Sequence, residues 1–386
     1  MKEEIVDLAT ALIRIPSRVG VDSPDPILEY LKDWTSRHHL RTEYLFGVDG
    51  AKIGLFAHIA SGRPGPVLCL NACIDTAPFG NEKNWTDPPT SGKIRDGHLY
   101  GRGAADSKMG VAIFSSLASA LQRDNALPAG ELYVVFDADE HSGEFQGIKS
   151  FIRTAPKIPK AALIGYPNND RLIIGSRGFL RGAVSVYGTA AHSGSGSSHG
   201  FNAIDKAACL IQAIHNRQLP EEPDPVFHHG PRVTVTEITG GQGYSVVPDL
   251  CQFKLDFRLT PKVDRTIAEQ WLEAILRAGD ADDPGPIDTQ IEWGESWPAY
   301  HVPKESALVQ CVLRAAKEVF GRKIPTAISG PSNIGNYLAI NKIPTLSGFG
   351  VTGYNIHAAD ENLELESVLP VYETYRRAIP MLLKEL

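Results

Sequence analysis

The sequence predicts an α/β fold: a mainly parallel sheet flanked by helices, with a smaller α+β domain inserted into it. Short apolar runs alternate with helix-like segments up to residue 164, and this alternation is typical of a parallel sheet. From residue 178 onward the strands become two-sided, with apolar and polar residues in turn. The chain has 386 residues, more than the roughly 150 of an average domain, so we expect more than one domain.

The first domain begins with a helix. Over residues 3–15, Ile5, Leu8 and Leu12 fall on one helical face, and Pro16 ends the segment. The apolar runs that follow predict buried strands, and a stretch of small and apolar residues between the first two predicts a buried helix. In chain order these segments are Val67–Leu70, the helix Met109–Leu121, Leu132–Phe136 and Ala161–Ile164.

The insertion is predicted from alternating strands and one helix. Its segments are strands at 182–188, 232–238 and 251–259 and a helix at 202–217. The acidic, proline-bearing stretch 279–288 predicts a turn that leads out of it. A helix at 306–320, a strand at 344–348 and a closing helix at 366–386 then resume the first domain. We therefore expect residues 1–177 and 291–386 to form one domain and residues 178–290 to form the inserted one.

Charge and composition exclude several classes of function. Lys and Arg number 38 against 45 Asp and Glu, which gives a net charge of −7. The sequence has no dense basic stretch, the feature expected of a protein that binds nucleic acid or an anionic membrane. Glu3, Glu4 and Asp7 lie where a secretory signal would be basic and then apolar. The sequence also lacks the run of ~18 apolar residues that a membrane-spanning helix needs. Five scattered cysteines indicate a reduced setting. We expect a cytoplasmic protein that acts on a small molecule or a short peptide.

Polar residues directly follow the predicted buried strands. In an open parallel sheet, ligands bind outside the carboxyl ends of the strands, so these polar residues are candidate site residues. They are Cys73 and Asp75 after the first strand, Asp106 before the buried helix, Asp139, Glu140 and His141 after the second strand, Tyr166 after the third, and His357 and Glu361 near the C-terminus.

Five motifs, taken together, resemble those of a known enzyme family. They are YGRGAADSKMG around Asp106, ADEHSG around Glu140, GTAAHSG around His192, DFRLTP around Arg258 and IHAADE around His357. The chain is similar, over nearly its whole length, to the zinc-dependent amidohydrolases and peptidases that include acetylornithine deacetylase, succinyl-diaminopimelate desuccinylase, aminoacylase and the glutamate carboxypeptidases. The resemblance implies a zinc-peptidase-like catalytic domain, an inserted dimerisation or lid domain, and a homodimer.

The family's pattern, carried over position by position, implies a role for each matching residue of the catalytic domain. Asp106 falls on the carboxylate that bridges two metal ions, and His357 falls on a ligand of one of them. Glu140 falls on the general base. Asp75 falls on the acid that orients the first metal ligand, two residues after it.

Three residues of the insertion match positions that bind substrate in the family. His192 corresponds to a histidine that is presented to the active site of the partner subunit, and Arg258 corresponds to the arginine that grips a substrate carboxylate. Ser245 stands where some carboxypeptidases carry an asparagine that acts with this arginine.

Three of the five expected metal ligands depart from the family's pattern. Cys73 stands in place of a histidine, His141 in place of a glutamate, and Tyr166 in place of a Glu or Asp. Two divalent ions bring four positive charges and Asp106 is the one sure anion, so we expect one ion rather than two. Asp106, His141 and His357 form a two-histidine, one-carboxylate set with room for a water. Zinc is the expected metal, with Co, Mn or Fe as alternatives, and Cys73 and Tyr166 stay open as additional ligands.

The resemblance, together with this ligand set, implies a metal-dependent hydrolase that cleaves an amide bond of a small N-acyl amino acid or dipeptide-like substrate with a free carboxylate. The metal would polarise the carbonyl and supply hydroxide, while Glu140 would shuttle the proton. Two alternatives stay open. The replaced ligands are compatible with a catalytically silent relative that binds a carboxylated ligand, and Cys73 could instead act as a nucleophile with His141 as its base.

Overall fold

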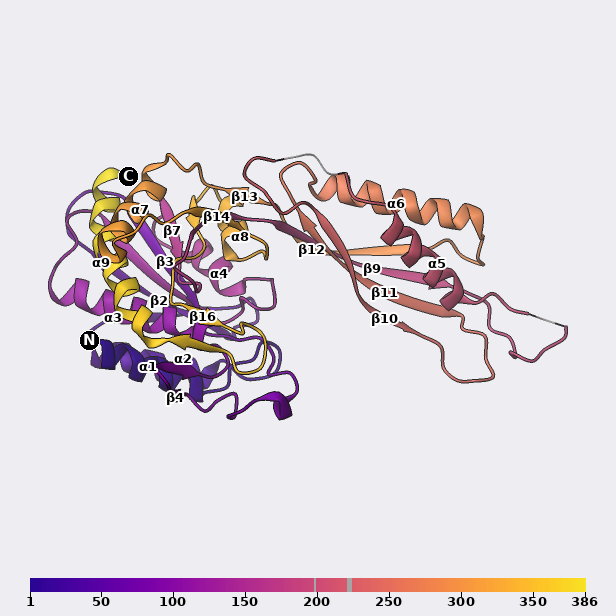
Figure 1. Ribbon diagram of the computed structural model, residues 1–386, viewed down its shortest axis with the longest axis horizontal. Coiled ribbons are helices and arrows are strands. Elements are labelled where there is room, and N and C mark those ends of the chain that lie inside the picture. The colour runs from indigo at the N-terminus through magenta and orange to yellow at the C-terminus, as the bar shows by residue number, and fades with distance from the viewer. Residues whose placement is uncertain (198, 221–223) are drawn as a thin grey trace. The chain divides into compact units, whose positions relative to one another are not determined.

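A six-stranded sheet organises the first of two units in the computed structural model, which describes residues 1–197, 199–220 and 224–386 (Figure 1). This first unit comprises Met1–Gly175, His301–Ser329 and Asn333–Leu386. Its strands lie in the order β1 (Thr42–Phe46), β2 (Lys52–Ala60), β6 (Glu131–Asp137), β3 (Val67–Cys73), β7 (Ala161–Ile164) and β15 (Thr345–Leu346). The pairings from β6 to β15 are parallel, whereas β1 with β2 and β2 with β6 are antiparallel.

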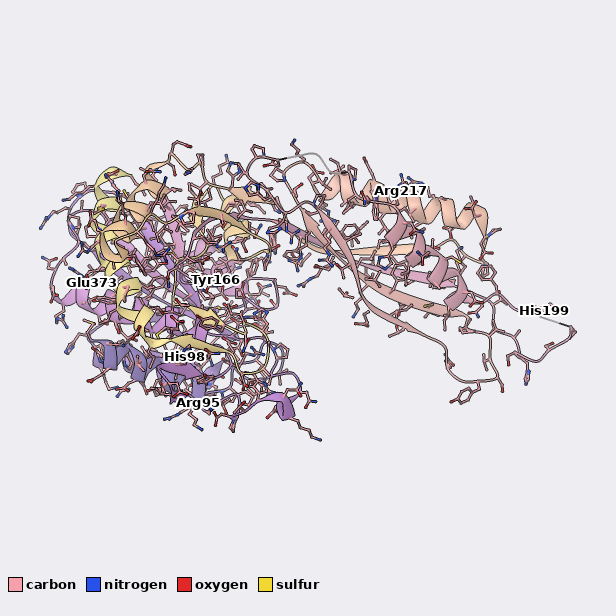
Figure 2. The ribbon with its side chains drawn as sticks, viewed as in Figure 1. Arg95, His98, Tyr166, His199, Arg217 and Glu373 are labelled. Carbon is pink, nitrogen blue, oxygen red and sulfur yellow. The ribbon has the colours of Figure 1, made fainter. Side chains whose placement is uncertain are left out.

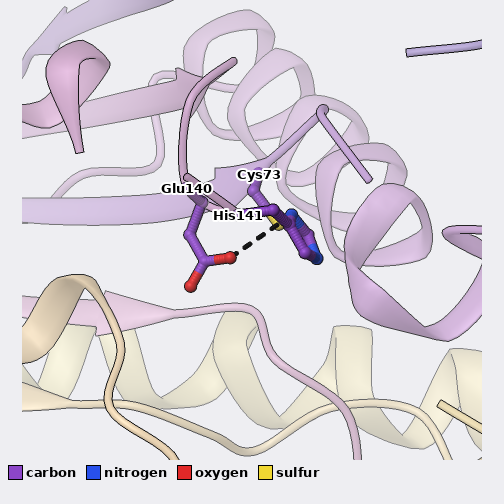
Figure 3. Close-up of side chains that lie close together, drawn as sticks. All are labelled: Cys73, Glu140 and His141. Carbon is purple, nitrogen blue, oxygen red and sulfur yellow. Dashed lines mark ion pairs between the residues drawn. The ribbon is translucent and has the colours of Figure 1, made fainter. Parts of the chain in front are cut away.

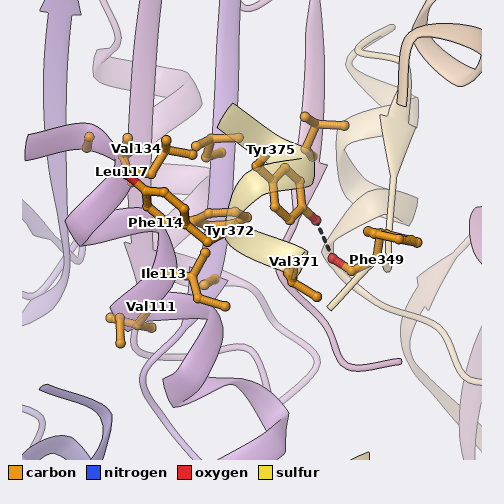
Figure 4. Packing of buried hydrophobic residues seen from close by; sticks show 14 of the residues in the cluster. Val111, Ile113, Phe114, Leu117, Val134, Phe349, Val371, Tyr372 and Tyr375 are labelled. Carbon is orange, nitrogen blue, oxygen red and sulfur yellow. Dashed lines mark hydrogen bonds between the residues drawn. The ribbon is translucent and has the colours of Figure 1, made fainter. Parts of the chain in front are cut away.

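Helices cover both faces of this sheet. On one face, α1 (Lys2–Arg14), α2 (Asp25–Arg37), α3 (Met109–Arg123), α7 (Ala307–Phe320) and α9 (Val368–Glu385) share one apolar core with the strands. On the other face, Phe151 of α4 (Gln146–Thr154) packs against Phe56 and Tyr133. Figure 4 shows Phe114 of α3 edge-on to Tyr375 of α9, whose hydroxyl donates a hydrogen bond to the Phe349 carbonyl oxygen at 2.6 Å.

The approach of α3 to the sheet depends on a glycine. A Cβ atom at Gly110 would lie 2.4 Å from the carbonyl oxygen of Gly165, closer than two such atoms can pack. Glycine at this position therefore lets the start of α3 lie against the end of β7, directly before Tyr166.

Two further small sheets lie within the described ranges. One has the order β13 (Tyr300–His301), β8 (Leu172–Ser176) and β14 (Thr326–Ser329), and a short helix α8 (Ile334–Ile340) follows β14 in the chain. The other has the order β16 (Gly353–Tyr354), β17 (Asn362–Glu364), β5 (His98–Tyr100) and β4 (Lys93–Arg95). Because β17 pairs with β5, the chain around His357 lies beside the chain that leads to Asp106.

The second unit comprises Ser176–Tyr300 and Gly330–Ser332. Its antiparallel sheet has the order β10 (Arg232–Gly240), β11 (Leu250–Leu259), β9 (Gly178–Tyr187) and β12 (Gln290–Trp297). The helices α5 (Ala203–Asn216) and α6 (Arg265–Asp282) lie against this sheet, where side chains such as Leu210, Phe253 and Leu272 form a separate core. The Nζ atom of Lys206 in α5 lies 2.6 Å from Oδ1 of Asp280 in α6, which joins the two helices.

The predicted fold class is confirmed, and several details differ. The sequence did not predict strands β1 and β2 or helices α2 and α4. In the described part of the second unit, two helices, α5 and α6, are present where one was predicted. Helix α6 continues to Asp282, inside the stretch 279–288 that was predicted as a turn. Strand β12 pairs with β9, so the second unit runs to Tyr300 rather than to residue 290. Across the described ranges, the helices are all too short or too polar to cross a membrane.

Candidate metal centre

The candidate centre lies at the carboxyl ends of three adjacent parallel strands. Cys73 at the end of β3 is in register with Asp137 at the end of β6, and β7 pairs with the other side of β3. The polar residues that follow these strands therefore meet at one edge of the sheet.

Asp106, His141 and His357 come together there, with one ligand atom from each lying within 4.8 Å of the others. His357 Nε2 lies 3.2 Å from Asp106 Oδ2, and His141 Nε2 lies 4.0 Å from the same oxygen. The three residues come from separate parts of the chain: the turn Ala104–Lys108, the loop after β6 and the loop after β16. The structure thus brings together the predicted two-histidine, one-carboxylate set.

Two buried atoms of this set lack hydrogen-bond partners among the residues that the structure describes: Asp106 Oδ1 and His141 Nε2. A buried polar atom without a hydrogen-bond partner lowers the stability of the folded protein by roughly 1–3 kcal/mol. Two such atoms at one place therefore indicate a binding site for a ligand or an ion. A carboxylate oxygen and an imidazole nitrogen are both ligands of zinc and related divalent ions. The residues therefore fit a divalent cation.

Asp75 orients His141. Its Oδ2 lies 3.0 Å from His141 Nδ1 and accepts the backbone N–H of His141 at 2.8 Å, while its Oδ1 accepts the backbone N–H of Glu140 at 3.1 Å. Because Nδ1 is engaged, Nε2 is the nitrogen left for a ligand. The resemblance assigned Asp75 to the residue at position 73, and in the structure it contacts His141 instead. Burial opposes a charge on His141, but Asp75 and Glu140 raise the pKa of its ring to about 10.

Glu140 is held by a tyrosine. The hydroxyl of Tyr166 (Figure 2) donates a hydrogen bond to Glu140 Oε1 at 2.7 Å, and Glu140 Oε2 lies 3.3 Å from His141 Nδ1. Burial raises the pKa of Glu140 to about 7, and burial raises the pKa of Tyr166 well above its usual value. Tyr166 therefore contacts the candidate base, as a neutral donor.

Cys73 is buried beneath this pair. It forms a second cluster with Glu140 and His141 in which the ligand atoms lie within 4.8 Å (Figure 3). Its thiol has no exposed surface and lies 3.2 Å from the Ser107 hydroxyl, and burial raises its pKa well above the usual value. A thiol sealed in this way cannot reach a substrate carbonyl, which argues against the nucleophile alternative.

Residues next to Asp106 fix the turn that carries it. Ser107 Oγ accepts the backbone N–H of Cys73 at 3.0 Å. The Nζ of Lys108 donates to the carbonyl oxygens of Leu12 and Ile15, both at 2.9 Å, at the end of α1. Neither Ser107 nor Lys108 was among the candidate residues predicted from the sequence. The signal was available, because polar residues directly beside a candidate ligand in a buried segment need partners.

His192, Ser245 and Arg258 lie in the second unit. His192 and Ser245 are exposed and belong to two paired loops: the backbone N–H of Ser193 donates to the Ser245 carbonyl oxygen at 3.0 Å. Arg258 Nε donates to Asp256 Oδ2 at 2.9 Å. Their predicted contacts with substrate stay predictions.

Two arginines that no sequence motif singles out belong to the same cluster as Arg258. Arg232 on β10 lies directly opposite Arg258 on β11, and Arg177 donates to the carbonyl oxygens of Gly330 and Gly230 at 3.0 and 2.9 Å. Burial and then the charges of Arg258 and Arg232 lower the pKa of Arg177. Like charges opposite one another destabilise a sheet, so this cluster is suited to an anion.

The chain is similar to known proteins in sequence and in overall fold. A succinyl-diaminopimelate desuccinylase of Psychrobacter arcticus is 26% identical over 397 residues, covering 99% of this chain and 95% of the relative. The crystal structure of an M20 family metallo-carboxypeptidase from Sulfolobus solfataricus has a TM-score of 0.82 at 17% identity, covering 98% of this chain and 99% of that one. The crystal structure of the Bacillus subtilis YXEP protein, a dinuclear metal binding peptidase from the M20 family, has a TM-score of 0.72 at 15% identity. The match covers 100% of this chain and 98% of that one.

The model of Peptidase family M20/M25/M40 matches residues 69–380, which is more than half of the chain. This match confirms the resemblance that the five motifs indicated. The chain therefore belongs to peptidase family M20/M25/M40 and is a hydrolase.

Proposed function

We propose that the protein is a metal-dependent hydrolase that cleaves an amide bond of a small N-acyl amino acid or dipeptide-like substrate with a free carboxylate. The observation that carries the proposal is the convergence of Asp106, His141 and His357. Two buried atoms of this set, Asp106 Oδ1 and His141 Nε2, have no hydrogen-bond partner among the described residues. Asp106, His141 Nε2 and His357 would hold the cation, for which zinc is the first candidate.

A divalent cation held by these residues would polarise a carbonyl and lower the pKa of a water molecule, the chemistry that amide hydrolysis requires. Glu140 accepts the proton of the attacking water, since its carboxylate lies beside His141. Tyr166 holds Glu140 in one orientation through the 2.7 Å hydrogen bond, and Asp75 keeps the proton of His141 on Nδ1.

We infer one cation rather than two. A second cation beside Cys73 and Glu140 would need His141 Nδ1, which Asp75 already engages, or the Cys73 thiol, which is buried and contacts Ser107. It would also compete with Tyr166 for Glu140 Oε1. Tyr166 and Cys73 are then supporting residues, and not ligands.

The arginine cluster supports a carboxylate on the substrate. Guanidinium groups bind carboxylates through two parallel hydrogen bonds, and Arg258 lies opposite Arg232 with Asp256 as its ion-pair partner. The related desuccinylase and metallo-carboxypeptidase both bear names of enzymes that act on carboxylated substrates. The acyl group is to be found by assaying N-succinyl and N-acetyl amino acids against dipeptides.

We also propose a cytoplasmic homodimer in which His192 acts at the active site of the other copy. The test mixes two inactive variants, His192→Ala and Glu140→Gln, after unfolding and refolding them together. Recovery of part of the activity is expected, because a mixed dimer has one intact site. A mixture that stays inactive in an assembly of proven dimers contradicts action across the dimer.

The test of the proposed function is elemental analysis of the purified protein combined with assays of Glu140→Gln and a control, Glu144→Gln. Glu144 is exposed and accepts a hydrogen bond from Gln146. We expect stoichiometric metal in all three proteins, loss of turnover in Glu140→Gln by about 100-fold or more, and normal turnover in Glu144→Gln. Protein without stoichiometric metal and insensitive to chelators would instead support the silent relative.

A further inference from the structure

A buried ion pair lies behind the candidate centre. Glu361 has no exposed surface and Arg102 is 2% exposed, and Arg102 Nη1 donates to Glu361 Oε2 at 2.7 Å. The same carboxylate accepts three backbone N–H groups of one turn: Gly103 on Oε2 at 3.1 Å, and Ala105 and Asp106 on Oε1 at 3.1 and 3.2 Å. Three amides and a guanidinium thus enclose one side chain.

This arrangement joins the two chain segments that supply ligands. Asp106 donates its own backbone N–H to Glu361, and Glu361 follows His357 by four residues in the same loop. The carbonyl oxygen of Glu361 also accepts the N–H of Gly101 at 2.9 Å. Glu361 therefore links the backbone at Asp106 to the loop that carries His357.

Arg102 also contacts a third segment, residues 78–85. Its Nε and Nη2 donate to the Pro78 carbonyl oxygen at 3.2 and 3.0 Å, and its guanidinium lies over the Trp85 ring at 5.2 Å. The loop 78–85 follows Asp75 in the chain. The pair consequently connects the three segments that carry or orient the proposed ligands.

A buried ion pair is a poor source of stability, because desolvation of the two charges offsets their attraction. Replacing it with apolar residues would serve a purely structural need. What an apolar pair cannot do is accept three backbone N–H groups at one point and so fix the direction of the Asp106 backbone. The structure therefore favours a role in placing ligands.

We propose that Glu361, with Arg102, is a positioning residue that presets the separation of Asp106 and His357 for a cation. Partners of ligand-bearing groups commonly contribute 10–100-fold to metal affinity. The inference rests on the proposed function, since it presumes that Asp106 and His357 hold a cation.

The experiment compares wild-type protein, Glu361→Gln and the control Glu364→Gln, each stripped of metal. Glu364 is on the same segment and bonds the exposed Tyr354 hydroxyl. Zinc affinity is measured by competition with a chromophoric chelator, and folding of the metal-free proteins by circular dichroism and urea unfolding. Glu361→Gln keeps the shape but places an amide N–H₂ against backbone donors. We expect about 10–100-fold weaker zinc binding, and turnover close to wild type once zinc is saturating.

Three outcomes are decisive. Equal zinc affinity in Glu361→Gln and wild type overturns the inference and leaves the proposed function intact, whereas no zinc binding by wild type overturns the proposed function itself. If Glu361→Gln does not fold, Glu361→Asp is used, because it keeps the charge but is too short to reach both sets of donors. If neither variant folds, Glu361 is a structural residue and the inference is wrong.

Discussion

The contact between Asp75 and His141 gives a sharp prediction. In Asp75→Asn, one of the two side-chain oxygens becomes an N–H₂ group. Asp75 accepts from three donors, namely His141 Nδ1 at 3.0 Å and the backbone N–H groups of His141 and Glu140 at 2.8 and 3.1 Å. If the amide oxygen stays near His141, the N–H₂ group faces the N–H of Glu140, and donor meets donor.

The magnitude follows from these contacts. A hydrogen bond to a charged group contributes about 1.5–3 kcal/mol, and Asp75 is only 3% exposed, so water does not replace the lost charge. Taking about 2 kcal/mol, with tenfold for each 1.4 kcal/mol, gives about 30-fold weaker metal binding. The effect falls on metal affinity, because His141 Nε2 keeps its lone pair but loses the partner that fixes the ring.

The assay titrates metal-free protein with zinc against a competing chelator and follows turnover at each zinc concentration. The control is Asp22→Asn, which removes a carboxylate that pairs with Arg18 at 2.8 Å. Asp75→Asn should need about 30-fold more free zinc for half activity and then recover most of its turnover, while Asp22→Asn should follow wild type. Wild-type zinc affinity in Asp75→Asn would refute the orienting role.

Three further predictions concern Tyr166, Arg258 and Asp280. Tyr166→Phe removes one hydrogen bond to Glu140 and should lower kcat about tenfold with KM and metal content unchanged; loss of metal would instead make Tyr166 a ligand. Arg258→Ala should raise KM for a carboxylated substrate about 100-fold or more, with little change for the matching amide and none in metal content, and an unaltered KM would remove Arg258 from the substrate site. Asp280→Asn leaves the buried Lys206 charge without its partner and should reduce the free energy of unfolding in urea at pH 7 by about 3 kcal/mol. Although burial opposes it, Lys206 and Thr289 hold the pKa of Asp280 below its usual 3.8, so the wild-type advantage is present above that pH and is lost as pH falls through the folded-state pKa; an advantage that persists at pH 2 would contradict the pairing.

The sequence predicts the parts of the site that depend on buried strands. The runs ending near Cys73, Phe136 and Ile164 are apolar on both faces, as strands of a covered parallel sheet are, so the polar residues after them could be placed at one edge. The strands β1 and β2, at one end of the sheet, are partly exposed and mixed in composition, and this leaves no comparable signal.

Tertiary contacts account for the features that the sequence does not reveal. The end of α6 is acidic and contains glycine, which suggests a turn, but Asp280 bonds Lys206 and Thr289 and the helix continues. The assignment of Asp75 to His141 could not be read from spacing either, because the two lie 66 residues apart and meet only when β3 and β6 pair. Glu361 could be singled out as polar, but not its contact with the Asp106 backbone.

The most direct test of the account is the number of metal ions per chain and the atoms that bind them. Metal-free protein is loaded with zinc, the bound ions are counted by elemental analysis after gel filtration, and X-ray absorption at the zinc edge identifies the ligand atoms. We predict one ion per chain, bound by nitrogen and oxygen alone. Two ions per chain, or sulfur from Cys73 among the ligands, would contradict a centre built on Asp106, His141 and His357.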